Sequence, residues 1–329
     1  MNKPLRIGTR DSQLAVWQAT LVKEQLHQYG VASELVYIKS EGDIDLVTPL
    51  YELGVQGIFT QTLDAALLNN RIDIAVHSMK DVPTQPAKGI VQAAVLKRAS
   101  HKDLLVFKGD EQKIFDVLGF VNGEWSDENS KFNPEISGQN SKFTVATSSI
   151  RRKAQWLNRY PGHTIDNLRG NVNTRLRKVE ESNWNGAIFA AAGLERIGLR
   201  PEKSIELDWM LPAPAQGAIM IVCKEEDSYS KEVCSQLNDD ATALCTKIER
   251  DFLRALLGGC ATPISALAEW KEGSIVFNGN ILSVDGKEKI SVSLERNASE
   301  SDNLGIVAAQ HLLEKGADSI LKKIRNAGA

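Results

Sequence analysis

Cysteine is scarce in this chain, and the cysteines present form no recognisable metal-binding or disulfide pattern. Four occur in 329 residues, all in the C-terminal third, and no two of them form a CxxC pair. Few histidines lie near them, so we expect neither a zinc site nor a disulfide framework, and no other bound metal. The chain also lacks any apolar run of about 18 residues, the length that crosses a membrane.

Charge of one sign is not in excess either. Lys and Arg number 39 against 42 Asp and Glu, a net charge of −3, which argues against a strongly basic nucleic-acid-binding protein. The first ten residues leave no room for the charged and then apolar pattern of a signal peptide, so we expect a cytoplasmic protein without a membrane partner. The composition, 42% hydrophobic and 25% charged, is that of a globular protein, and roughly 100–200 residues per domain suggests two or three domains.

Short apolar segments alternate with amphipathic ones over the first 190 residues. The pattern predicts strands at 7–9, 34–38, 72–76, 143–147, 164–165 and 187–190, and helices at 12–26, 60–68, 149–160 and 172–181. Strands that alternate with helices favour largely parallel sheets. Thr9 and Thr147 each precede a helix, with a tryptophan eight or nine residues later. Two ordinary strand–helix units explain this weak repeat about as well as a duplication does.

The rest of the chain follows a different pattern. Residues 108–142 are rich in Asn, Ser, Gly and acidic residues and show little periodicity outside 114–120, which predicts a surface insertion. Beyond residue 235 the pattern predicts a small α+β third domain, with helices at 241–257 and 304–315 and strands at 264–270, 274–281 and 289–294.

One segment is strongly basic. Residues 151–178 contain eight Lys and Arg residues and a single acidic residue, Asp166. Arg151 and Arg152 are expected in the first turn of a helix, where the positive end of the helix dipole disfavours a cation unless an anion is also present. Guanidinium groups bind carboxylates and phosphates through paired hydrogen bonds, so an anionic ligand is one interpretation. A solvated basic face is the other, and RNA binding is disfavoured because no aromatic residues interleave with the arginines.

Two further positions could carry chemistry. The segment from His77 to Pro83 follows directly on an apolar strand, and ligands of α/β sheets bind at the carboxyl ends of strands. Asp81 could there stabilise a developing cation, or Lys80 and Asp81 could be an ordinary exposed pair. Cys260 follows two glycines on a loop, which suits an accessible thiol, although buried inert cysteines are common. Residues 39–57 could form a mobile lid or a plain connection.

Seven segments, in order from residue 6 to residue 264, resemble the porphobilinogen deaminase family, also called hydroxymethylbilane synthases. They are Arg6–Arg10, Ile74–Pro83, Ala146–Arg152, Leu168–Leu176, Ala192–Arg196, Leu211–Gly217 and Gly258–Ile264. Any one of these segments could match by chance, but the ordered set is highly specific.

The resemblance implies a fold of two lobes like those of type II periplasmic binding proteins, plus a small C-terminal α+β domain. The implied domains are 1–105 with 213–232, then 106–212, then 233–329. The implied reaction is the stepwise head-to-tail addition of four porphobilinogens to a covalent dipyrromethane cofactor, each with loss of ammonia, followed by hydrolytic release of hydroxymethylbilane. The family further implies a monomer that passes its product to uroporphyrinogen-III synthase, in haem biosynthesis.

The resemblance also implies roles for individual residues. Asp81 would be catalytic, stabilising the azafulvene-type cation left when ammonia departs. The cofactor would be attached to Cys260 by a thioether, and it would be held by Ser78, Lys80, Asp81, Thr147, Ser148, Ser149, Arg151, Arg152, Arg169 and Gly170. The substrate would be bound by Arg10, Gln18, Phe59, Arg169, Arg175 and Arg196.

A second hypothesis, from a different class, stays open on the residues alone. The two-lobed plan and the basic segment also suit a cytoplasmic module that binds or senses an anion. Such a module has no need for Cys260, so the role of this thiol distinguishes the two hypotheses.

Overall fold

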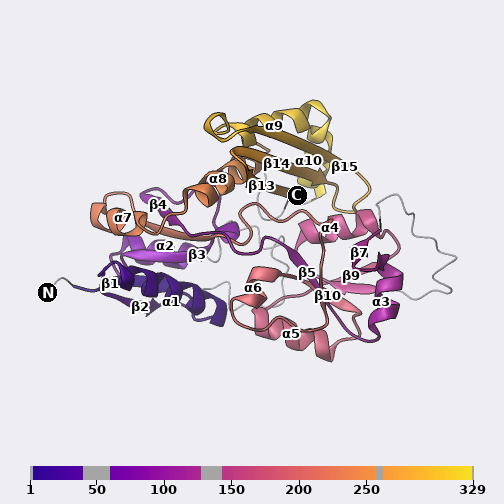
Figure 1. Cartoon of the computed structure of the whole chain (residues 1–329), viewed down its shortest axis with the longest axis horizontal. Coiled ribbons are helices and arrows are strands. Elements are labelled where there is room, and N and C mark those ends of the chain that lie inside the picture. Colours follow the sequence, from indigo (N-terminus) through magenta and orange to yellow (C-terminus); the bar gives the residue numbers. More distant parts are fainter. Residues whose placement is uncertain (1–2, 40–59, 127–142, 257–261, 328–329) are drawn as a thin grey trace.

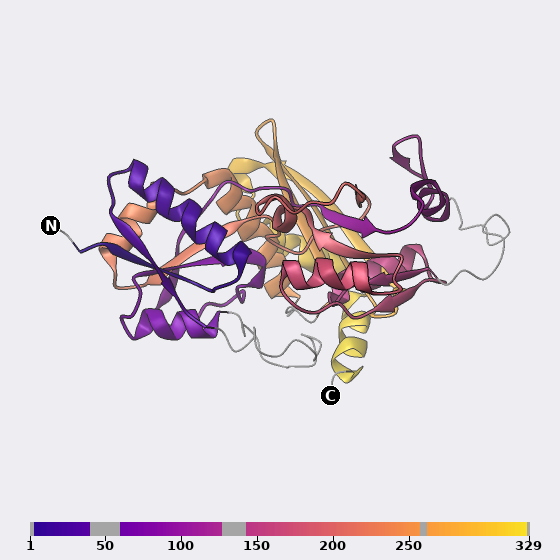
Figure 2. The same cartoon turned by 90° about the horizontal axis from the view of Figure 1, so that it is seen from below.

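Three units make up the molecule, two lobes side by side and a third domain that lies against both of them. A computed structural model describes residues 3–39, 60–126, 143–256 and 262–327. Figure 1 shows the first lobe on the left, the second on the right and the third domain, in yellow, above them. In the view from below the third domain lies behind the two lobes (Figure 2).

The first lobe is a five-stranded sheet with helices packed on it. Its strands, in spatial order, are β2 (Ser33–Tyr37), β1 (Leu5–Thr9), β3 (Ile74–Ser78), β12 (Ile219–Lys224) and β4 (Ile90–Val95). β1 pairs in parallel with β2 and β3, whereas β12 runs antiparallel to β3 and β4. Helix α1 (Gln13–Gln28) buries Ala19, Val22 and Leu26 in the core of this lobe, and α2 (Gln61–Leu68) buries Leu63 and Leu67 in a second apolar cluster of the same lobe.

The second lobe repeats this plan. Its strands, in spatial order, are β9 (Thr164–Asp166), β8 (Thr144–Ala146), β10 (Gly186–Ala190), β5 (Asp103–Phe107) and β11 (Ser204–Glu206). β8 pairs in parallel with β9 and β10, and β5 is antiparallel to its neighbours. Its helices include α4 (Ile150–Arg159), α5 (Val172–Glu181) and α6 (Ala191–Glu195). The expected α/β class with two lobes is confirmed, and the lobes share one strand order with the antiparallel strand in the same place.

The antiparallel strand of each lobe explains the two connections between the lobes. The chain leaves the first lobe after β4 and enters the second through β5, and it returns through β12. The expected domain boundary after residue 105 is therefore misplaced, because it falls inside β5, whose residues pair within the second sheet. The predicted third domain includes Val233 and Cys234 of α7 (Ser228–Ser235), but these residues are buried in the core of the first lobe.

Residues 108–142 were expected to be a surface insertion, and this is wrong for their first half. Helix α3 (Glu111–Leu118) buries Ile114 and Leu118 in the core of the second lobe. The hairpin of β6 (Phe120–Val121) and β7 (Glu124–Trp125) follows, and the Trp125 ring meets that of Trp209 edge to face at 6.2 Å. The polar composition concealed a short amphipathic helix. Residues 127–142 lie outside the described residues.

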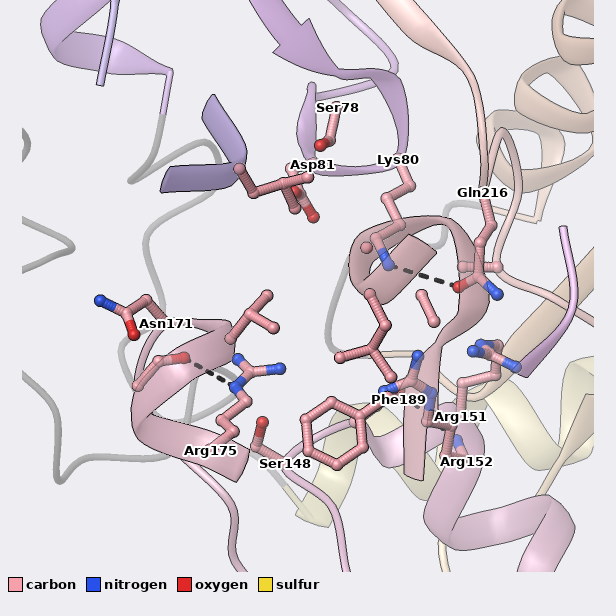
Figure 3. Close-up of a pocket in the computed structure, with 18 of the residues that line it drawn as sticks. Ser78, Lys80, Asp81, Ser148, Arg151, Arg152, Asn171, Arg175, Phe189 and Gln216 are labelled. Atoms are coloured by element: carbon pink, nitrogen blue, oxygen red, sulfur yellow. Dashed lines mark hydrogen bonds between the residues drawn. The ribbon is translucent and has the colours of Figure 1, made fainter. Parts of the chain in front are cut away.

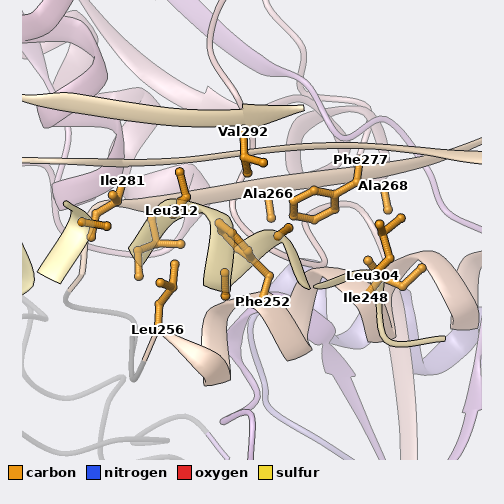
Figure 4. Packing of buried hydrophobic residues seen from close by; sticks show 14 of the residues in the cluster. Ile248, Phe252, Leu256, Ala266, Ala268, Phe277, Ile281, Val292, Leu304 and Leu312 are labelled. Carbon is orange, nitrogen blue, oxygen red and sulfur yellow. The ribbon is translucent and has the colours of Figure 1, made fainter. Parts of the chain in front are cut away.

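The third domain packs helices on one face of an antiparallel sheet. The sheet consists of β13 (Ile264–Lys271), β14 (Ser274–Leu282) and β15 (Lys289–Asn297), and the helices are α8 (Asp240–Ala255), α9 (Leu304–Glu314) and α10 (Ala317–Ala327). Phe252 of α8 and Phe277 of β14 meet edge to face at the centre of this core (Figure 4). The small α+β domain expected here is confirmed.

Polar contacts attach the third domain to both lobes. The buried carboxylate of Glu249, on α8, forms an ion pair with Arg98 in the first connection, with a shortest distance of 2.6 Å. Asn158 of α4, in the second lobe, donates a hydrogen bond of 2.7 Å to the Gly286 carbonyl in the turn after β14. Among the described helices, none is long and apolar enough to span a membrane.

The closest approach of α8 and α9 supplies a test of the packing. A Cβ atom at Gly305 would lie 2.0 Å from the Ile248 carbonyl oxygen. We expect Gly305→Ala to lower the free energy of unfolding by about 1–3 kcal/mol or more, because overpacking outweighs the gain of up to about 1 kcal/mol in helix propensity. Thermal and urea unfolding measure the change.

The matched control is Gly162→Ala, because a Cβ atom there meets nothing within 4 Å. We expect its stability to lie within about 0.5 kcal/mol of the original chain. A Gly305→Ala variant as stable as this control would contradict the close packing of the two helices.

Candidate functional site

A pocket of about 340 Å³ lies between the lobes and reaches the third domain. It is formed where strands of both lobes end, since Arg10 follows β1, Ser78 ends β3 and Ala190 ends β10. The carboxyl ends of the strands therefore face the same space from both sides, the place where α/β folds bind ligands. Leu253 and Thr262 contribute to its wall from the third domain.

Positive charge dominates the pocket. The cationic side chains that line it are Arg10, Lys80, Arg151, Arg152, Arg169 and Arg175. Asp81 is the one carboxylate among the described lining residues. Figure 3 shows Ser78, Lys80 and Asp81 on one side, from the first lobe, and Arg151, Arg152 and Arg175 on the other, from the second lobe. The pocket therefore concentrates cationic side chains, although the chain as a whole has a net charge of −3.

Two of these arginines share a buried carboxylate. Asp103, at the start of β5, accepts hydrogen bonds from Arg151 Nη2 at 2.8 Å and from Arg152 Nη2 at 2.7 Å, and all three side chains are buried. The spare guanidinium nitrogens donate to main-chain carbonyls, Arg151 to Leu211 at 2.6 Å and Arg152 to Ile188 at 2.9 Å. The anion expected near the first turn of α4 is therefore supplied, in part, by the chain itself.

The charge of Asp103 is firmly held. Burial alone would raise the pKa of its carboxyl, but the charges of Arg151 and Arg152 and their hydrogen bonds outweigh burial and keep the pKa well below its usual range. Asp103 stays ionised, and its single negative charge compensates only one of the two positive charges of Arg151 and Arg152. The cluster therefore keeps an uncompensated positive charge beside the pocket.

Gln216 extends this network across to the first lobe. It lies in the connection that precedes β12, and its amide nitrogen donates to Asp103 at 2.9 Å. Its amide oxygen accepts a hydrogen bond of 3.3 Å from Lys80 Nζ, drawn as a dashed line in Figure 3. Burial, opposed by the nearby charge of Asp81, lowers the pKa of Lys80 to about 8. Lys80 therefore carries most of its charge at neutral pH and begins to lose it in mildly alkaline solution.

Gly170, just before α5, shapes the wall of the pocket that the second lobe contributes. Its φ is +115°, and a Cβ atom would lie 2.7 Å from Thr174 Cγ2, so only glycine fits without strain. Its carbonyl accepts a hydrogen bond of 2.7 Å from Arg175 Nε. Burial, and then the charge of Arg152, lower the pKa of Arg175 to about 10. Arg175 is still fully charged at neutral pH, and its orientation is fixed.

Three predicted residues lie beside the pocket and are not among its described lining residues. Gln18, on α1, is buried and donates a hydrogen bond of 2.9 Å to Ser78 Oγ. Thr147 Oγ1 accepts a hydrogen bond from the Ser149 amide. Arg196 Nη2 donates to the Gly217 carbonyl at 2.7 Å, and its guanidinium lies over the Trp17 ring. Their direct binding to a ligand stays a prediction, whereas their contacts position other groups.

The remaining predicted residues divide into two sets. Ser78, Lys80, Asp81, Ser148, Ser149, Arg10, Arg151, Arg152, Arg169, Gly170 and Arg175 are brought together as expected, all of them lining the pocket. Phe59 and Cys260 lie outside the described residues, as does most of the segment 39–57. Thr262, two positions after Cys260 in the sequence, lines the pocket.

Asp103 and Gln216 were missed by the sequence analysis. A carboxylate at the start of the apolar run Leu104–Phe107 is a usable signal, because a charge beside a buried strand needs a partner. Gln216 stood within a segment that carried the resemblance, but nothing local marked it as a bridge between Asp103 and Lys80.

The lining fits a ligand that carries several carboxylates. Guanidinium and ammonium groups pair with carboxylates through charge-assisted hydrogen bonds. In addition, Arg151 Nε is buried without a hydrogen-bond partner, which leaves donor capacity at a residue of the pocket wall. A single carboxylate opposite these cations can stabilise a cation that develops on such a ligand.

Family models match nearly the whole chain. Residues 5–232 match the model described as "Porphobilinogen deaminase, dipyromethane cofactor binding domain", and residues 243–314 match "Porphobilinogen deaminase, C-terminal domain". The described site residues of both lobes lie within the first match.

Curated relatives of similar length carry the same name. A porphobilinogen deaminase of Chloroherpeton thalassium is 36% identical over 337 residues, covering 100% of both chains. Another, of Syntrophotalea carbinolica, is 38% identical over 321 residues, covering 96% of this chain and 95% of the relative. Among solved structures, the Bordetella pertussis BvgS VFT2 domain is 12% identical with a TM-score of 0.39, over 73% of this chain and 90% of that one.

The Asp103 cluster yields a prediction with a pH dependence. Asp103→Asn should lower the free energy of unfolding at pH 7 by about 3–5 kcal/mol, because two buried guanidinium groups lose their counter-charge. A carboxyl whose pKa is lower in the folded than in the unfolded protein stabilises the fold above the unfolded value, about 3.9 for Asp. That stabilisation is lost as the pH falls from about 4 toward the folded pKa. Urea unfolding at pH 7 and in steps below pH 4 measures both effects.

Asp208→Asn is the control, because Asp208 pairs with Lys102 at the surface. Its removal should cost no more than about 1 kcal/mol. Equal unfolding free energies for the original chain and Asp103→Asn at pH 7 would contradict the assigned role.

Proposed function

Because the chain belongs to the porphobilinogen deaminase family, we propose that it acts as a hydroxymethylbilane synthase, a transferase of tetrapyrrole biosynthesis. It joins four porphobilinogen molecules head to tail on a dipyrromethane cofactor, releasing one ammonia per step, and then hydrolyses the product free as hydroxymethylbilane. The family membership supports this activity over the alternative of an anion-binding module.

The observation that carries the proposal is the charge of the pocket. Porphobilinogen has an acetate and a propionate side chain, so every added unit brings two carboxylates. Six cations from both lobes line the pocket with one carboxylate among the described residues, Asp81. The cations of this lining can bind a chain of units that each carry two carboxylates, and the carboxylate of Asp81 can stabilise a positive charge that develops on the substrate.

The residues around the pocket suit the cofactor as well. The dipyrromethane, when bound, supplies the terminal pyrrole carbon to which new units are joined. Its carboxylates would be held by Lys80, Arg151, Arg152 and Arg169, with hydrogen bonds from Ser78, Ser148 and Ser149. We propose Cys260 as the attachment point, since Thr262, close to it in sequence, lines the pocket.

Asp81 is the proposed catalytic residue. It lines the pocket where the first lobe faces the arginines of the second. Loss of ammonia from porphobilinogen leaves a cation on the substrate, and an ionised carboxylate beside the pyrrole N–H group stabilises this charge. Asp81 also accepts and returns a proton as the new bond forms. Arg10 and Arg175 orient the substrate carboxylates.

The proposal extends to organisation and partners. We propose three domains as expected from the sequence, with the first boundary moved ahead of β5 and the third domain beginning after α7. We also propose that the protein acts as a monomer and that uroporphyrinogen-III synthase uses its product. A cytoplasmic location and the absence of a nucleic-acid partner stay predictions.

The intact mass of the protein tests the function directly. Measured under denaturing conditions, it should exceed the sequence mass by two porphobilinogens less two ammonias, and brief exposure to porphobilinogen should add further steps of one porphobilinogen less one ammonia. Peptide mapping should place the addition on Cys260. Cys260→Ser should carry no addition and form no product, with Cys245→Ser, a buried thiol in the core of the third domain, as the control that keeps both.

An unmodified mass that never changes with porphobilinogen would contradict the proposal and favour the anion-binding module.

The role of Asp81 predicts a specific kinetic defect. Asp81→Asn keeps the size of the side chain and removes the charge, so we expect kcat to fall by about 10²-fold or more. The melting temperature should stay within a few degrees, because Asp81 is half-buried and lines the pocket. Steady-state kinetics and thermal unfolding measure the two effects. Near-normal turnover by Asp81→Asn would show that another group carries the charge.

A further inference from the structure

One arginine of the third domain holds the main chain on both sides of Asp81. Arg250, on α8, donates from Nη1 to the Val82 carbonyl at 2.8 Å and from Nη2 to the Pro83 carbonyl at 2.6 Å. A longer hydrogen bond of 3.4 Å joins Nη1 to the Met79 carbonyl. The three acceptors belong to a single turn of the first lobe.

This turn presents its two faces to different surroundings. Met79–Asp81 forms a short 3₁₀ helix after β3, and the side chains of Lys80 and Asp81 line the pocket. The carbonyls of Met79, Val82 and Pro83 instead face α8. Within the turn itself, the Val82 amide donates to the Met79 carbonyl at 3.1 Å, and the Met79 amide donates to Ala218. Arg250 adds an anchor from outside the lobe.

An arginine suits this task for a geometric reason. Its guanidinium is planar and carries five donors in a rigid fork, so it can bind several carbonyls at once, whereas a lysine ammonium acts as a single flexible point. The neighbouring residue keeps α8 itself in place. Glu249 binds Arg98, and it accepts hydrogen bonds from the Ala215 and Ala268 amides at 2.6 and 2.8 Å. Because these contacts of Glu249 hold α8 in place, the guanidinium group of Arg250 projects from a helix whose position is fixed.

We propose that Arg250 is a positioning residue for the reaction, which sets the placement of Asp81 from the third domain. This inference rests on the proposed function of the pocket. The carboxylate must sit beside a charge that develops on the substrate, and small displacements of catalytic groups cost large factors in rate. The hydrogen bonds of Arg250 therefore connect the turn that carries Asp81 to the proposed cofactor domain.

We expect the fold to survive the loss of the Arg250 guanidinium. A second cavity of about 430 Å³ lies behind the turn and is lined by Thr84, Gln92, Lys247 and Arg250 among others. Its lining includes the charged side chains of Lys247 and Asp251, so water that enters it can solvate the carbonyls when the guanidinium is removed. We therefore expect Arg250→Gln to fold, with a turn that is less firmly held.

The control variant is Arg254→Gln, one turn further along α8. Arg254 donates to Asp251 at 2.7 Å, and its side chain is 49% exposed. It has the same charge on the same helix, but it is bonded to its own helix. Any effect of losing a cation from α8 in general should therefore appear in both variants.

The first measurement does not depend on activity. Hydrogen–deuterium exchange of the purified holoprotein should show faster exchange at the amides of residues 79–82 and of Thr84 in Arg250→Gln, by tenfold or more, and unchanged exchange in Arg254→Gln. Unchanged exchange in both variants would overturn the proposal. The original chain is assayed with porphobilinogen in parallel, so a failure of the proposed function appears there and not in the exchange data.

The second measurement is kinetic. Arg250→Gln should lower kcat by about tenfold or more and change KM by less than threefold, Arg250→Lys should recover part of the loss, and Arg254→Gln should match the original chain. In an Asp81→Asn background, Arg250→Gln should lower kcat by less than twofold, because its effect acts through Asp81. Equal losses of kcat with and without the Asp81 carboxylate would overturn the proposal and show a general structural role.

Discussion

A buried carboxylate, that of Asp103, is the constraint on which the pocket depends. Two adjacent arginines at the start of a helix repel each other and the helix dipole, and burial removes the water that would screen them. Asp103 binds both, and Gln216 joins it to Lys80 of the other lobe. One negative charge therefore orients three cations and leaves a positive surplus, which is what a ligand with many carboxylates requires.

The third domain serves this pocket through helix α8. Two neighbouring charged residues of α8 bind different parts of the lobes. Glu249 binds both connections between the lobes, at Arg98 and Ala215, and Arg250 binds the turn that carries Asp81. Asn158 ties the second lobe to the turn after β14. The same domain that buries its own apolar core thus contacts both lobes and the turn that carries Asp81.

Particular elements show where sequence patterns succeed and fail. The helices α1 and α5 were predicted within a few residues, because their apolar residues recur with the helical period. The strands β1 and β10 were predicted as short apolar segments, each followed by an amphipathic or polar segment. Strands β4, β5 and β12 were missed, since continuous apolar runs such as Leu104–Phe107 have no alternation. The sequence predicts a surface insertion where helix α3 forms, because Asn, Ser and Gly dominate its surroundings.

By itself, the sequence determined which chemical groups this protein has and where they stand along each strand and helix: the arginines of 151–175, the Lys80–Asp81 turn and Cys260. Those features are local, and local patterns express them directly. Only the tertiary structure decided which groups meet. Asp103 is 48 residues from Arg151 and 113 from Gln216, and Arg250 is 168 from Val82. No local period encodes such pairs, because they arise only when two sheets and a third domain pack and each buried charge must find a partner.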